Sequence, residues 1–483
     1  LFVGRGVVRK LRAYAYAGVI CSGTMMLAVA LLLGLQQMAR MFGAGEHARE
    51  LLVVTMVYAL FLSMLLTSFF QTYLSRYVAD LIYQEKPEKV MPSLIGASLV
   101  LMIPGGILYA VLLHTARDLT AAQKLLNWML FMELIPTWLQ MSYITAARDY
   151  RAILAVFAAG IALVVLIGLF LLMLGVDVIT ALMAALVVGY GTMMAGFMRV
   201  LLYYFPPGEG SAFAFIGWLS TVPDLLATGF FSMAGAFVHM VVMWFSPLGT
   251  SVTGAFRQAS LFDAAASYAF LVTVPTNVNF VVSVEVHFYG QYRRYFDAIT
   301  GGGTIGQISV ARENMRAVLR QEVSKLVQVQ LFFLVVYMLA MRYFLSGIGF
   351  TSDMIAMFQV MCIGYSAYCL GNSLMLLLLY FNDRKGALAA AFALFAVNLA
   401  VSLLTRTGPS LLYGIGVPAG GMAMFLTAMP RLLAYVERID YHVFCSQPVF
   451  NTYETGRFMR LAGWLDARAA RSKPTLGRGK TGR

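Results

Sequence analysis

The run Tyr203-Tyr204-Phe205-Pro206-Pro207-Gly208-Glu209-Gly210 lies near the middle of the chain and decides how the fold is divided. Its prolines and glycines cannot continue a helix, so the run predicts a break between helices. Six long apolar segments precede it and six follow it. We therefore expect two six-helix bundles joined by a hinge.

The composition indicates a membrane protein. Apolar residues make up 60% of the sequence and charged residues 12%, whereas a soluble domain carries roughly 25% charged residues. A water-soluble core cannot hide so much apolar surface, so lipid is expected to cover it. This excludes a soluble globular protein and predicts an all-α membrane fold.

Twelve windows are long and apolar enough to span a membrane, which takes about 20 residues in a helix. They cover residues 14–39, 51–74, 92–114, 125–147, 152–174, 178–202, 212–245, 264–288, 327–346, 354–381, 386–405 and 409–434. The seventh is longer than a span requires, so we expect an interfacial turn or a bend at Pro223. The expected organisation is an N-terminal bundle (1–202), a hinge loop (203–211), a C-terminal bundle (212–436) and a basic tail (437–483).

The basic residues predict the orientation. An even number of spans places both termini on one side, and 28 of the 35 Lys and Arg residues fall on that side. By the positive-inside rule both termini are expected in the cytoplasm. The net charge of +13 is then mostly a topology signal, and no nucleic-acid partner is needed to explain it.

The basic residues before the first window resemble the charged region of a signal peptide. They are Arg5, Arg9, Lys10 and Arg12. The apolar run that follows is too long for a signal peptide, and no small-residue cleavage site interrupts it. We expect this run to remain as the first span.

No pattern in the sequence predicts an enzyme, a metal site or a cofactor. There is no Walker A run, no HExxH motif and no GxSxG motif. The four cysteines form no CxxC pair, and we interpret them as packing residues. They are Cys21, Cys362, Cys369 and Cys445. These observations argue against an ATP-driven pump and against a chain that hydrolyses a substrate itself.

One loop expected in the cytoplasm, residues 289–326, is long and carries a charged helical stretch. Three of its arginines are four residues apart and share one helix face. This stretch is either a solvated helix resting on anionic headgroups or a docking surface for a cytoplasmic partner. The candidate docking residues are Arg293, Arg294, Arg312, Arg316 and Arg320.

Polar side chains at membrane depth are costly and usually face an interior cavity. The candidates to line such a cavity are Glu133, Asp224, Asn277, Asn279 and Glu285. In the functional interpretation Glu133 and Asp224, placed mid-membrane and one in each bundle, face a polar or cationic cargo or a coupling proton. In the structural interpretation Glu133 bonds between helices, and Asp224 caps a half-helix broken at Pro223.

The other polar residues also have structural interpretations. Asn277 and Asn279 are suited to hydrogen bonds between helices, and Glu285 is suited to pairing with Arg293 or Arg294. His239 stands alone in the outer half of the seventh window. We interpret it as a packed histidine and not as a proton relay.

Several stretches resemble one transporter family over most of the chain. They are Leu11-Arg12-Ala13-Tyr14 followed by Ala17-Gly18-Val19-Ile20-Cys21-Ser22-Gly23, Ser75-Arg76-Tyr77-Val78-Ala79-Asp80, Val274-Pro275 with the run from Asn279 to Tyr295, Leu378-Leu379-Tyr380-Phe381-Asn382-Asp383-Arg384-Lys385, and Asp440-Tyr441-His442-Val443-Phe444-Cys445-Ser446-Gln447-Pro448. Together they resemble the PelG family of Pel exopolysaccharide transporters, in the multidrug/oligosaccharidyl-lipid/polysaccharide (MOP) flippase superfamily. The resemblance extends to about residue 450.

The resemblance implies a two-bundle, MATE/MOP-like fold that moves a growing polysaccharide across the cytoplasmic membrane. It also implies partners: a cytoplasmic PelF-like glycosyltransferase and, in many systems, a PelD-like membrane receptor for cyclic di-GMP and a PelE-like subunit. The segment 289–326 is then expected to hold the polymerase at the mouth of the cavity.

The residues and the resemblance together predict an exporter whose rocking bundles open a cavity alternately inward and outward, or whose cavity guides a chain fed by the synthase. Other functions stay open. They are a multidrug or organic-cation antiporter, a lipid-linked oligosaccharide flippase, a membrane-embedded glycosyl- or acyltransferase, and a non-conducting scaffold of a synthase. An antiporter exchanges small cations for protons without a synthase, and a transferase needs a catalytic His or carboxylate pair near the inner face.

Overall fold

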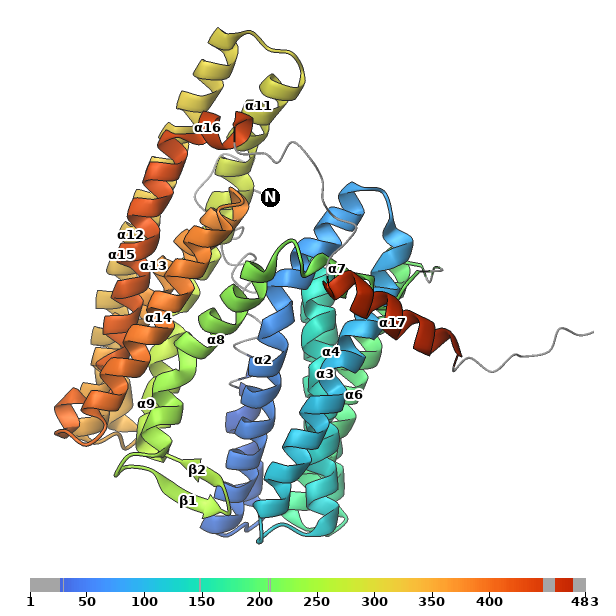
Figure 1. The fold of residues 1–483 in the computed structure, drawn as a ribbon. Helices are drawn as coiled ribbons and strands as arrows, with labels where there is room; N and C mark the ends of the chain where they lie inside the picture. The colour runs from blue at the N-terminus through green and yellow to red at the C-terminus, as the bar shows by residue number, and fades with distance from the viewer. Residues whose placement is uncertain are drawn as a thin grey trace, which may run out of the picture.

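The computed structural model describes residues 27–28, 30–146, 149–206, 208, 210–445 and 457–471. Within this part the chain is almost wholly helical (Figure 1). Ten helical segments are long and apolar enough to cross a membrane, so the expected all-α membrane fold is confirmed. The first expected span, 14–39, lies partly outside the described residues, and the count of twelve spans stays a prediction.

The first group of helices comes from the N-terminal half of the chain. It consists of α2 (Glu46–Tyr83), α3 (Val90–Thr115), α4 (Ala121–Ala146), α5 (Tyr150–Met173) and α6 (Val178–Tyr204). The central helix is α4, which packs on α2, α3 and α6, while α5 packs on α6. Asp149 and Asp177 start α5 and α6 because their carboxylates accept hydrogen bonds from backbone N–H groups of the first turn.

The second group comes from the C-terminal half. It consists of α8 (Pro223–Trp244), α9 (Ser260–Phe270), α10 (Val274–Val282), α11 (Tyr289–Thr300), α12 (Ile305–Gly347), α13 (Ser352–Tyr380), α14 (Arg384–Thr405) and α15 (Gly416–Glu437). Its central helix is α13, which packs on α9, α12, α14 and α15. The helix α14 also packs on α8 and α15.

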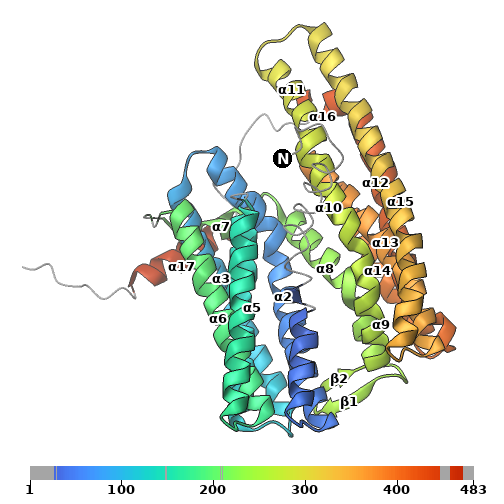
Figure 2. The same ribbon diagram turned by 180° about the vertical axis from the view of Figure 1, so that it is seen from behind.

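The two groups meet along α2 and α8. They lie close together where the strands β1 (Thr250–Thr253) and β2 (Phe256–Gln258) are, and they diverge toward the short helix α7 (Ala214–Trp218) (Figures 1 and 2). We call these two ends of the molecule the hairpin end and the α7 end. Helix α6 ends at Tyr204 and α7 begins at Ala214. The hinge position at 203–211 stays a prediction.

Proline divides two of the expected spans. The seventh window, 212–245, is α7, a turn and then α8, with Pro223 in the first turn of α8; this confirms the expected interfacial turn. The eighth window, 264–288, is α9, a short 3₁₀ turn, α10 with Pro275 in its first turn, and a π-helical turn, Ser283–Phe288. A proline removes a backbone donor and so favours such breaks.

The connection 289–326, expected to carry a charged helical stretch, is helical over most of its length. The segment is two helices, α11 and the first half of α12, which extend beyond the α7 end as an antiparallel pair (Figures 1 and 2). Thr304 begins α12 with a capping box, in which its side chain and that of Gln307 bond each other's backbone N–H groups. The glycines before Thr304 supply the tight turn, with Gly302 at φ +71°.

The β-hairpin was not expected from the apolar windows. Its two strands pair antiparallel and turn at Gly254, whose φ is +54°. A side chain at Gly254 would collide with the backbone of Thr115 at the end of α3, since an added Cβ would lie 2.1 Å from the Thr115 carbonyl oxygen. Glycine therefore lets the hairpin from the second group rest directly on the first.

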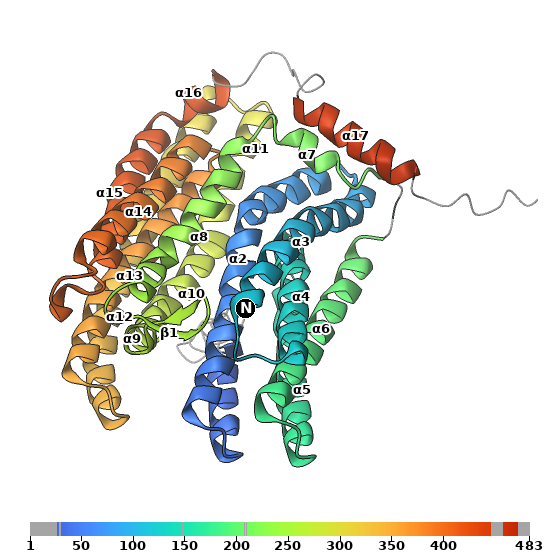
Figure 3. The same cartoon turned by 60° about the horizontal axis from the view of Figure 1, so that its bottom comes forward.

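The C-terminal segment contacts both groups. The short helix α16 (Ile439–Phe444) follows α15, and α17 (Arg457–Arg471) lies beside α7 (Figure 3). On α17, Met459 packs against Gly217, and Ala462 is buried. The hydroxyl of Ser211 donates to the carboxylate of Asp466. The basic tail is thus partly helical and attached to the α7 end.

Candidate functional site

A cavity of about 740 Å³ lies between the two groups of helices. It is lined by the C-terminal half of α2, the first half of α8, the C-terminal half of α13 and the turn before α14. This volume falls in the range of about 300–1,000 Å³ that ligand sites occupy. Its polar lining residues are Ser68, Gln71, Thr72, Ser75, Arg76, Asp80, Thr221, Ser232, Asn372, Asn382 and Arg384.

A stripe of polar side chains on α2 forms one wall of the cavity. Ser68, Gln71, Thr72 and Ser75 recur every three or four residues, so they share one face of the helix. The hydroxyls of Ser68 and Ser75 donate to backbone carbonyls of their own helix. Such bonds satisfy the donors while leaving the hydroxyl oxygens able to accept hydrogen bonds from a ligand.

The opposite wall depends on the turn between α13 and α14. Asn382 adopts a left-handed conformation, with φ of +64°, and lines the cavity. Asp383 is buried, caps α14 at the Gly386 N–H and accepts two hydrogen bonds from Arg431, at 2.6 and 3.1 Å. The ion pair holds the turn in place and so positions the residues on either side of it.

Arg384 connects the turn to the other side of the cavity mouth. Its guanidinium donates to the Thr221 carbonyl at 2.9 Å, just before α8 begins. On α2, Arg76 and Asp80 form an ion pair with a separation of 3.2 Å. Arg76 is therefore paired with a carboxylate, whereas Arg384 bonds a neutral carbonyl and keeps its positive charge at the mouth. Otherwise the cavity offers a ligand mainly hydroxyl and amide groups.

Aromatic rings surround the mouth. Trp218, Tyr368 and Tyr380 line the cavity, and Tyr380 packs edge-on against Tyr292 of α11 with ring centroids 4.7 Å apart. Burial raises the pKa of the Tyr292 hydroxyl, and the positive charge of Arg76 partly offsets this increase. Flat rings beside hydroxyl and amide groups suit a ligand that has both C–H faces and hydroxyl edges.

The cavity ends where α2 and α8 touch. A Cβ added to Gly229 would lie 2.2 Å from the Ser68 carbonyl oxygen, so the two backbones are in direct contact. The rings of Phe69 and Phe230 stack with centroids 4.4 Å apart on the side of this contact that faces α3, where both line a separate pocket with Leu66 and Tyr109. The contact at Gly229 limits the cavity on the side of the hairpin end.

The hairpin end is closed by a separate set of contacts. Tyr58 of α2 donates to the Arg257 carbonyl and accepts from the Arg257 N–H, both at 3.1 Å, and its ring stacks on Trp244. The Trp244 indole donates to the partly buried carboxylate of Asp263, and the Arg257 guanidinium donates to the Trp244 carbonyl. A smaller cavity of about 360 Å³ lies beside these residues. These contacts hold α2 to the hairpin and to α8 at this end of the molecule.

Among the described residues, Glu133, Asp224, Asn277 and Asn279 do not belong to the lining of this cavity. Glu133 lies on α4 inside the first group, where its carboxylate faces Gly191 of α6 and one of its oxygens is buried without a partner among the described residues. Asn277 accepts a hydrogen bond from Cys369, and Asn279 is buried on α10. The side chain of Glu285 lies outside the described residues.

The expected place of Asp224 is corrected. The sequence placed it near the middle of a span, but it lies in the first turn of α8. The reason is that residues 212–222 form α7 and a turn instead of the first half of a long helix. At this position the carboxylate complements the dipole at the helix N-terminus. The N-cap residue itself, Val222, provides no side-chain hydrogen bond to the first turn. His239 is buried and bonds Tyr365, as expected for a packed histidine.

The sequence reasoning missed the cavity residues of α2. It searched for ionisable groups within apolar windows, whereas this wall is built mainly of hydroxyl and amide side chains. The signal was present as the spacing of Ser68, Gln71, Thr72 and Ser75. The segments around Arg76 and Asn382 supported the family resemblance, although neither residue was proposed as a site.

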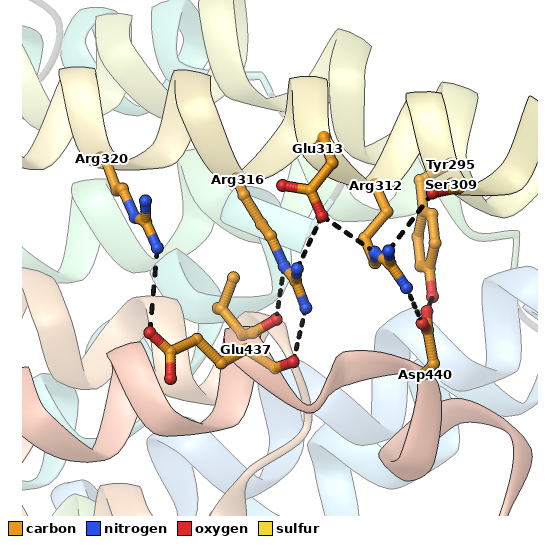
Figure 4. A network of polar contacts seen from close by, with 9 residues as sticks. Tyr295, Ser309, Arg312, Glu313, Arg316, Arg320, Glu437 and Asp440 are labelled. Carbon is orange, nitrogen blue, oxygen red and sulfur yellow. Dashed lines mark hydrogen bonds and ion pairs between the residues drawn. The ribbon is translucent and has the colours of Figure 1, made fainter.

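The candidate docking arginines lie on the helical pair α11–α12, and two of them are engaged within the protein (Figure 4). Arg312 forms an ion pair with Asp440 of α16. Arg316 donates from Nε to the Val436 carbonyl at 3.0 Å and also to the Glu437 carbonyl. The last four C=O groups of a helix lack intrahelical partners, so Arg316 completes the end of α15.

Asp440 is the centre of this network. Tyr295 of α11 donates to its carboxylate at 2.7 Å, on the same side as Arg312 (Figure 4). Burial acts to raise the pKa of Asp440, but the hydrogen bonds from Tyr295 and Arg312 outweigh it, so the pKa lies below its usual value. The network fixes α11 and α12 to the end of α15, and it leaves Arg293, Arg294 and Arg320 as the exposed arginines among the five candidates.

Comparison with known proteins gives a family and a fold. The model of the family described as "PelG: Putative exopolysaccharide Exporter (EPS-E)" matches residues 1–444. No curated protein sequence matches the chain. Helix α17 lies beyond the part of the chain that the family model matches.

Solved structures of transporters are similar over nearly their whole length. An outward-facing multidrug resistance MATE family transporter of the MOP superfamily is 14% identical, with a TM-score of 0.59 over 87% of this chain and 96% of that chain. A MATE protein in the straight conformation is 12% identical, with a TM-score of 0.61 over 89% and 96%. A MOP superfamily transporter from Pyrococcus furiosus is 10% identical, with a TM-score of 0.59 over 89% and 96%. At these identities the likeness shows the fold, which is MATE-like.

Proposed function

Because the chain belongs to the PelG family of exopolysaccharide exporters, we propose that it moves nascent polysaccharide across the cytoplasmic membrane through the space between its two groups of helices. The family and the MATE-like fold make it a multi-pass membrane transporter. The observation that carries the proposed route is the 740 Å³ cavity, whose wall on α2 is a stripe of hydroxyl and amide groups in an otherwise apolar helix.

The α7 end faces the cytoplasm in this proposal. The excess of Lys and Arg residues on the side of both termini supports this orientation by the positive-inside rule. The cavity then opens to the compartment in which polysaccharide is synthesised, with both termini on the same side. The helical pair α11–α12 extends into the cytoplasm beside the cavity mouth.

The chemistry of the cavity suits a neutral or weakly charged sugar chain. Sugar hydroxyls pair with the hydroxyl and amide groups of Thr72 and Asn372, and the C–H faces of sugar rings pack on Trp218, Tyr368 or Tyr380. Arg76 is paired with Asp80 and Arg384 is held by the Thr221 carbonyl, so the mouth carries little net charge that would hold the polymer tightly. Weak contacts distributed along the wall allow a chain to slide.

Export requires the contacts between α2 and α8 to open. Separation of α2 from α8 at Gly229 and Ser68 extends the cavity toward the hairpin end, and release of Tyr58 from Arg257 opens that end to the outside. The hairpin end and the α7 end are held by different residues, so they can open at different times. This is the arrangement that alternating access requires.

Removal of the polar wall tests this function. The double change Thr72→Val and Asn372→Leu keeps each side chain close to its original shape but removes polar groups from both walls. Each hydrogen bond to the polymer contributes about 0.5–1.5 kcal/mol, so we expect polymer secretion to fall several-fold while protein level and unfolding temperature persist. Thr192→Val is the matched control, because Thr192 is exposed on α6 and bonds only its own helix. Unchanged secretion in the double variant would remove this cavity from the route.

We also propose that α11–α12 positions a PelF-like glycosyltransferase at the mouth, with PelD-like and PelE-like membrane subunits as further partners. The engaged positions of Arg312 and Arg316 direct this proposal to the exposed residues Arg293, Arg294 and Arg320. Arg293→Glu with Arg294→Glu is expected to reduce recovery of the glycosyltransferase with the membrane. Arg342→Glu, at the far end of α12, is the control. Equal recovery with both variants rejects the docking proposal and leaves the transport proposal standing.

A further inference from the structure

A groove of about 320 Å³ runs between α12 and α15, on the side of the molecule away from the central cavity. Both helices pack on α13 and so leave a space between their own surfaces. The two helices lie next to one another in Figures 1 and 2. The groove is therefore built into the packing of the second group.

The floor of the groove is apolar and its edge is polar. Leu319, Val323 and Val327 of α12 face Met429 and Leu432 of α15. At the edge, Arg320, Ser324 and Gln328 follow at intervals of four residues, so they share one face of α12. The Gln328 amide donates to the Ser324 hydroxyl at 3.3 Å. This pairing of an apolar trough with a polar edge matches an acyl chain attached to a polar headgroup.

The charge at the end of the groove is weakly engaged. Arg320 reaches the Glu437 carboxylate at 3.8 Å, and about 65% of its side chain is exposed (Figure 4). Its neighbour Arg316 makes several shorter bonds to Glu313 and the end of α15. An exposed ion pair contributes little to stability, so a phosphate can replace Glu437 as the partner of Arg320 at small loss.

The depth of the groove agrees with a lipid headgroup. The apolar window that crosses the membrane in α12 begins at residue 327. Arg320 lies seven residues before it, which is about 10 Å at 1.5 Å per residue. The headgroup layer extends about 5–8 Å beyond the hydrocarbon, and an arginine side chain can reach down into it.

We propose that this groove is a binding site for an anionic glycerophospholipid. The phosphate binds Arg320, the ester region lies beside Ser324 and Gln328, and one acyl chain lies along Val323, Val327 and Leu432. A zwitterionic lipid of the same chain length fits the trough but carries an ammonium group, so it gains less at Arg320. The occupied site joins α12 to α15 where the protein itself leaves them apart.

The test uses the full chain in nanodiscs that contain a trace of phosphatidylglycerol or phosphatidylcholine with a photoreactive diazirine in the acyl chain. After illumination, the label is mapped by mass spectrometry to peptides that contain residues 319–328 and 429–433. We expect about fivefold more labelling with the anionic probe, as one basic residue near the membrane surface provides. Arg320→Gln is expected to reduce the preference to parity, and Arg293→Gln, an exposed arginine outside the groove, is expected to keep it.

A second variant tests the trough itself. Ser324→Trp places a large side chain at the exposed edge of the groove and is expected to lower labelling by both probes there, without changing labelling elsewhere on the chain. Equal labelling by the two probes in the unmodified protein, or an unchanged preference in Arg320→Gln, would overturn the proposal. Labelling dispersed over all membrane-facing helices would overturn it as well, since it indicates bulk lipid only.

Discussion

Gly229 on α8 offers the sharpest test of the closed contact between the two groups of helices. A Cβ at this position would lie 2.2 Å from the Ser68 carbonyl oxygen and 3.2 Å from the Thr72 hydroxyl. Real Cβ atoms essentially never come closer than 3.0 Å, so Gly229→Ala must move α2 and α8 apart by about 0.8 Å. Both neighbours are in the continuous helix α2, which cannot yield locally.

The expected effect on stability has two terms of opposite sign. Alanine in place of glycine within a helix stabilises by about 0.5–1 kcal/mol, whereas overpacking of this kind costs about 1–3 kcal/mol. Gly229→Ala is therefore expected to destabilise the protein by up to about 2 kcal/mol. Gly290→Ala is the matched control, because no atom lies within 4 Å of its added Cβ, and it is expected to stabilise.

Thermal unfolding of the two purified variants in the same detergent measures the difference. We expect the unfolding temperature of Gly229→Ala to lie below that of the unmodified protein and that of Gly290→Ala to lie at or above it. If Gly229→Ala unfolds at the same temperature as Gly290→Ala, then α2 and α8 do not touch at Ser68. The description of the cavity as closed at its inner end would then be wrong.

Two further predictions concern the ion pairs near the cavity mouth. Asp383→Ala removes the cap of α14 and leaves Arg431, which is half exposed, without its carboxylate. The change is expected to destabilise the protein by about 2 kcal/mol and to reduce secretion. An unfolding temperature equal to that of the unmodified protein would contradict the role of this turn. Asp440→Asn is expected to lower the unfolding temperature at pH 7. The folded-state pKa of Asp440 lies below the unfolded value of about 3.9. Its contribution to stability is therefore present above that value and is lost as the pH falls through the lowered pKa. The difference in unfolding temperature between the variant and the unmodified protein should disappear in acid, and a difference that persists at pH 2 would contradict this.

The sequence predicted the arrangement of apolar spans because each span carries its own signal. A run of about 20 apolar residues is read without knowledge of its neighbours. The expected window 178–202 and the observed α6, Val178–Tyr204, begin at the same residue. Pro223 likewise predicted the break in the seventh window, since a proline limits the helix that contains it.

The cavity could not be predicted in the same way, because it depends on which helices face one another. Thr72 and Asn372 are 300 residues apart in the chain and line one space. Asp224 was expected either to face the cavity or to lie at the start of a half-helix broken at Pro223, and only the helix packing shows that it lies in the first turn of α8 and outside the cavity lining. The charged helical stretch expected within 289–326 continues into the next span as the single helix α12, whose start is marked by the capping pair Thr304 and Gln307.

Two polar residues inside the first group of helices lie away from the cavity. Glu133 and Gln140 lie within the first group on α4, and both have buried polar atoms without a partner among the described residues. A role for Glu133 in coupling to protons, expected from the sequence, stays a prediction. Its place away from the cavity means that such coupling would act through the packing of α4 against α6.

A reversible cross-link between Phe69→Cys and Phe230→Cys tests the central claim most directly, because these rings stack beside the contact that joins α2 to α8 and so hold the two groups of helices together. In a background without other cysteines, a short thiol-specific cross-linker is applied to cells that secrete polymer, and each single-cysteine variant serves as a control. The account predicts that secretion falls to background when the pair is linked and recovers after reduction. Secretion at an unchanged rate from the linked protein would contradict it, since the polymer would then pass without any separation of the two groups of helices.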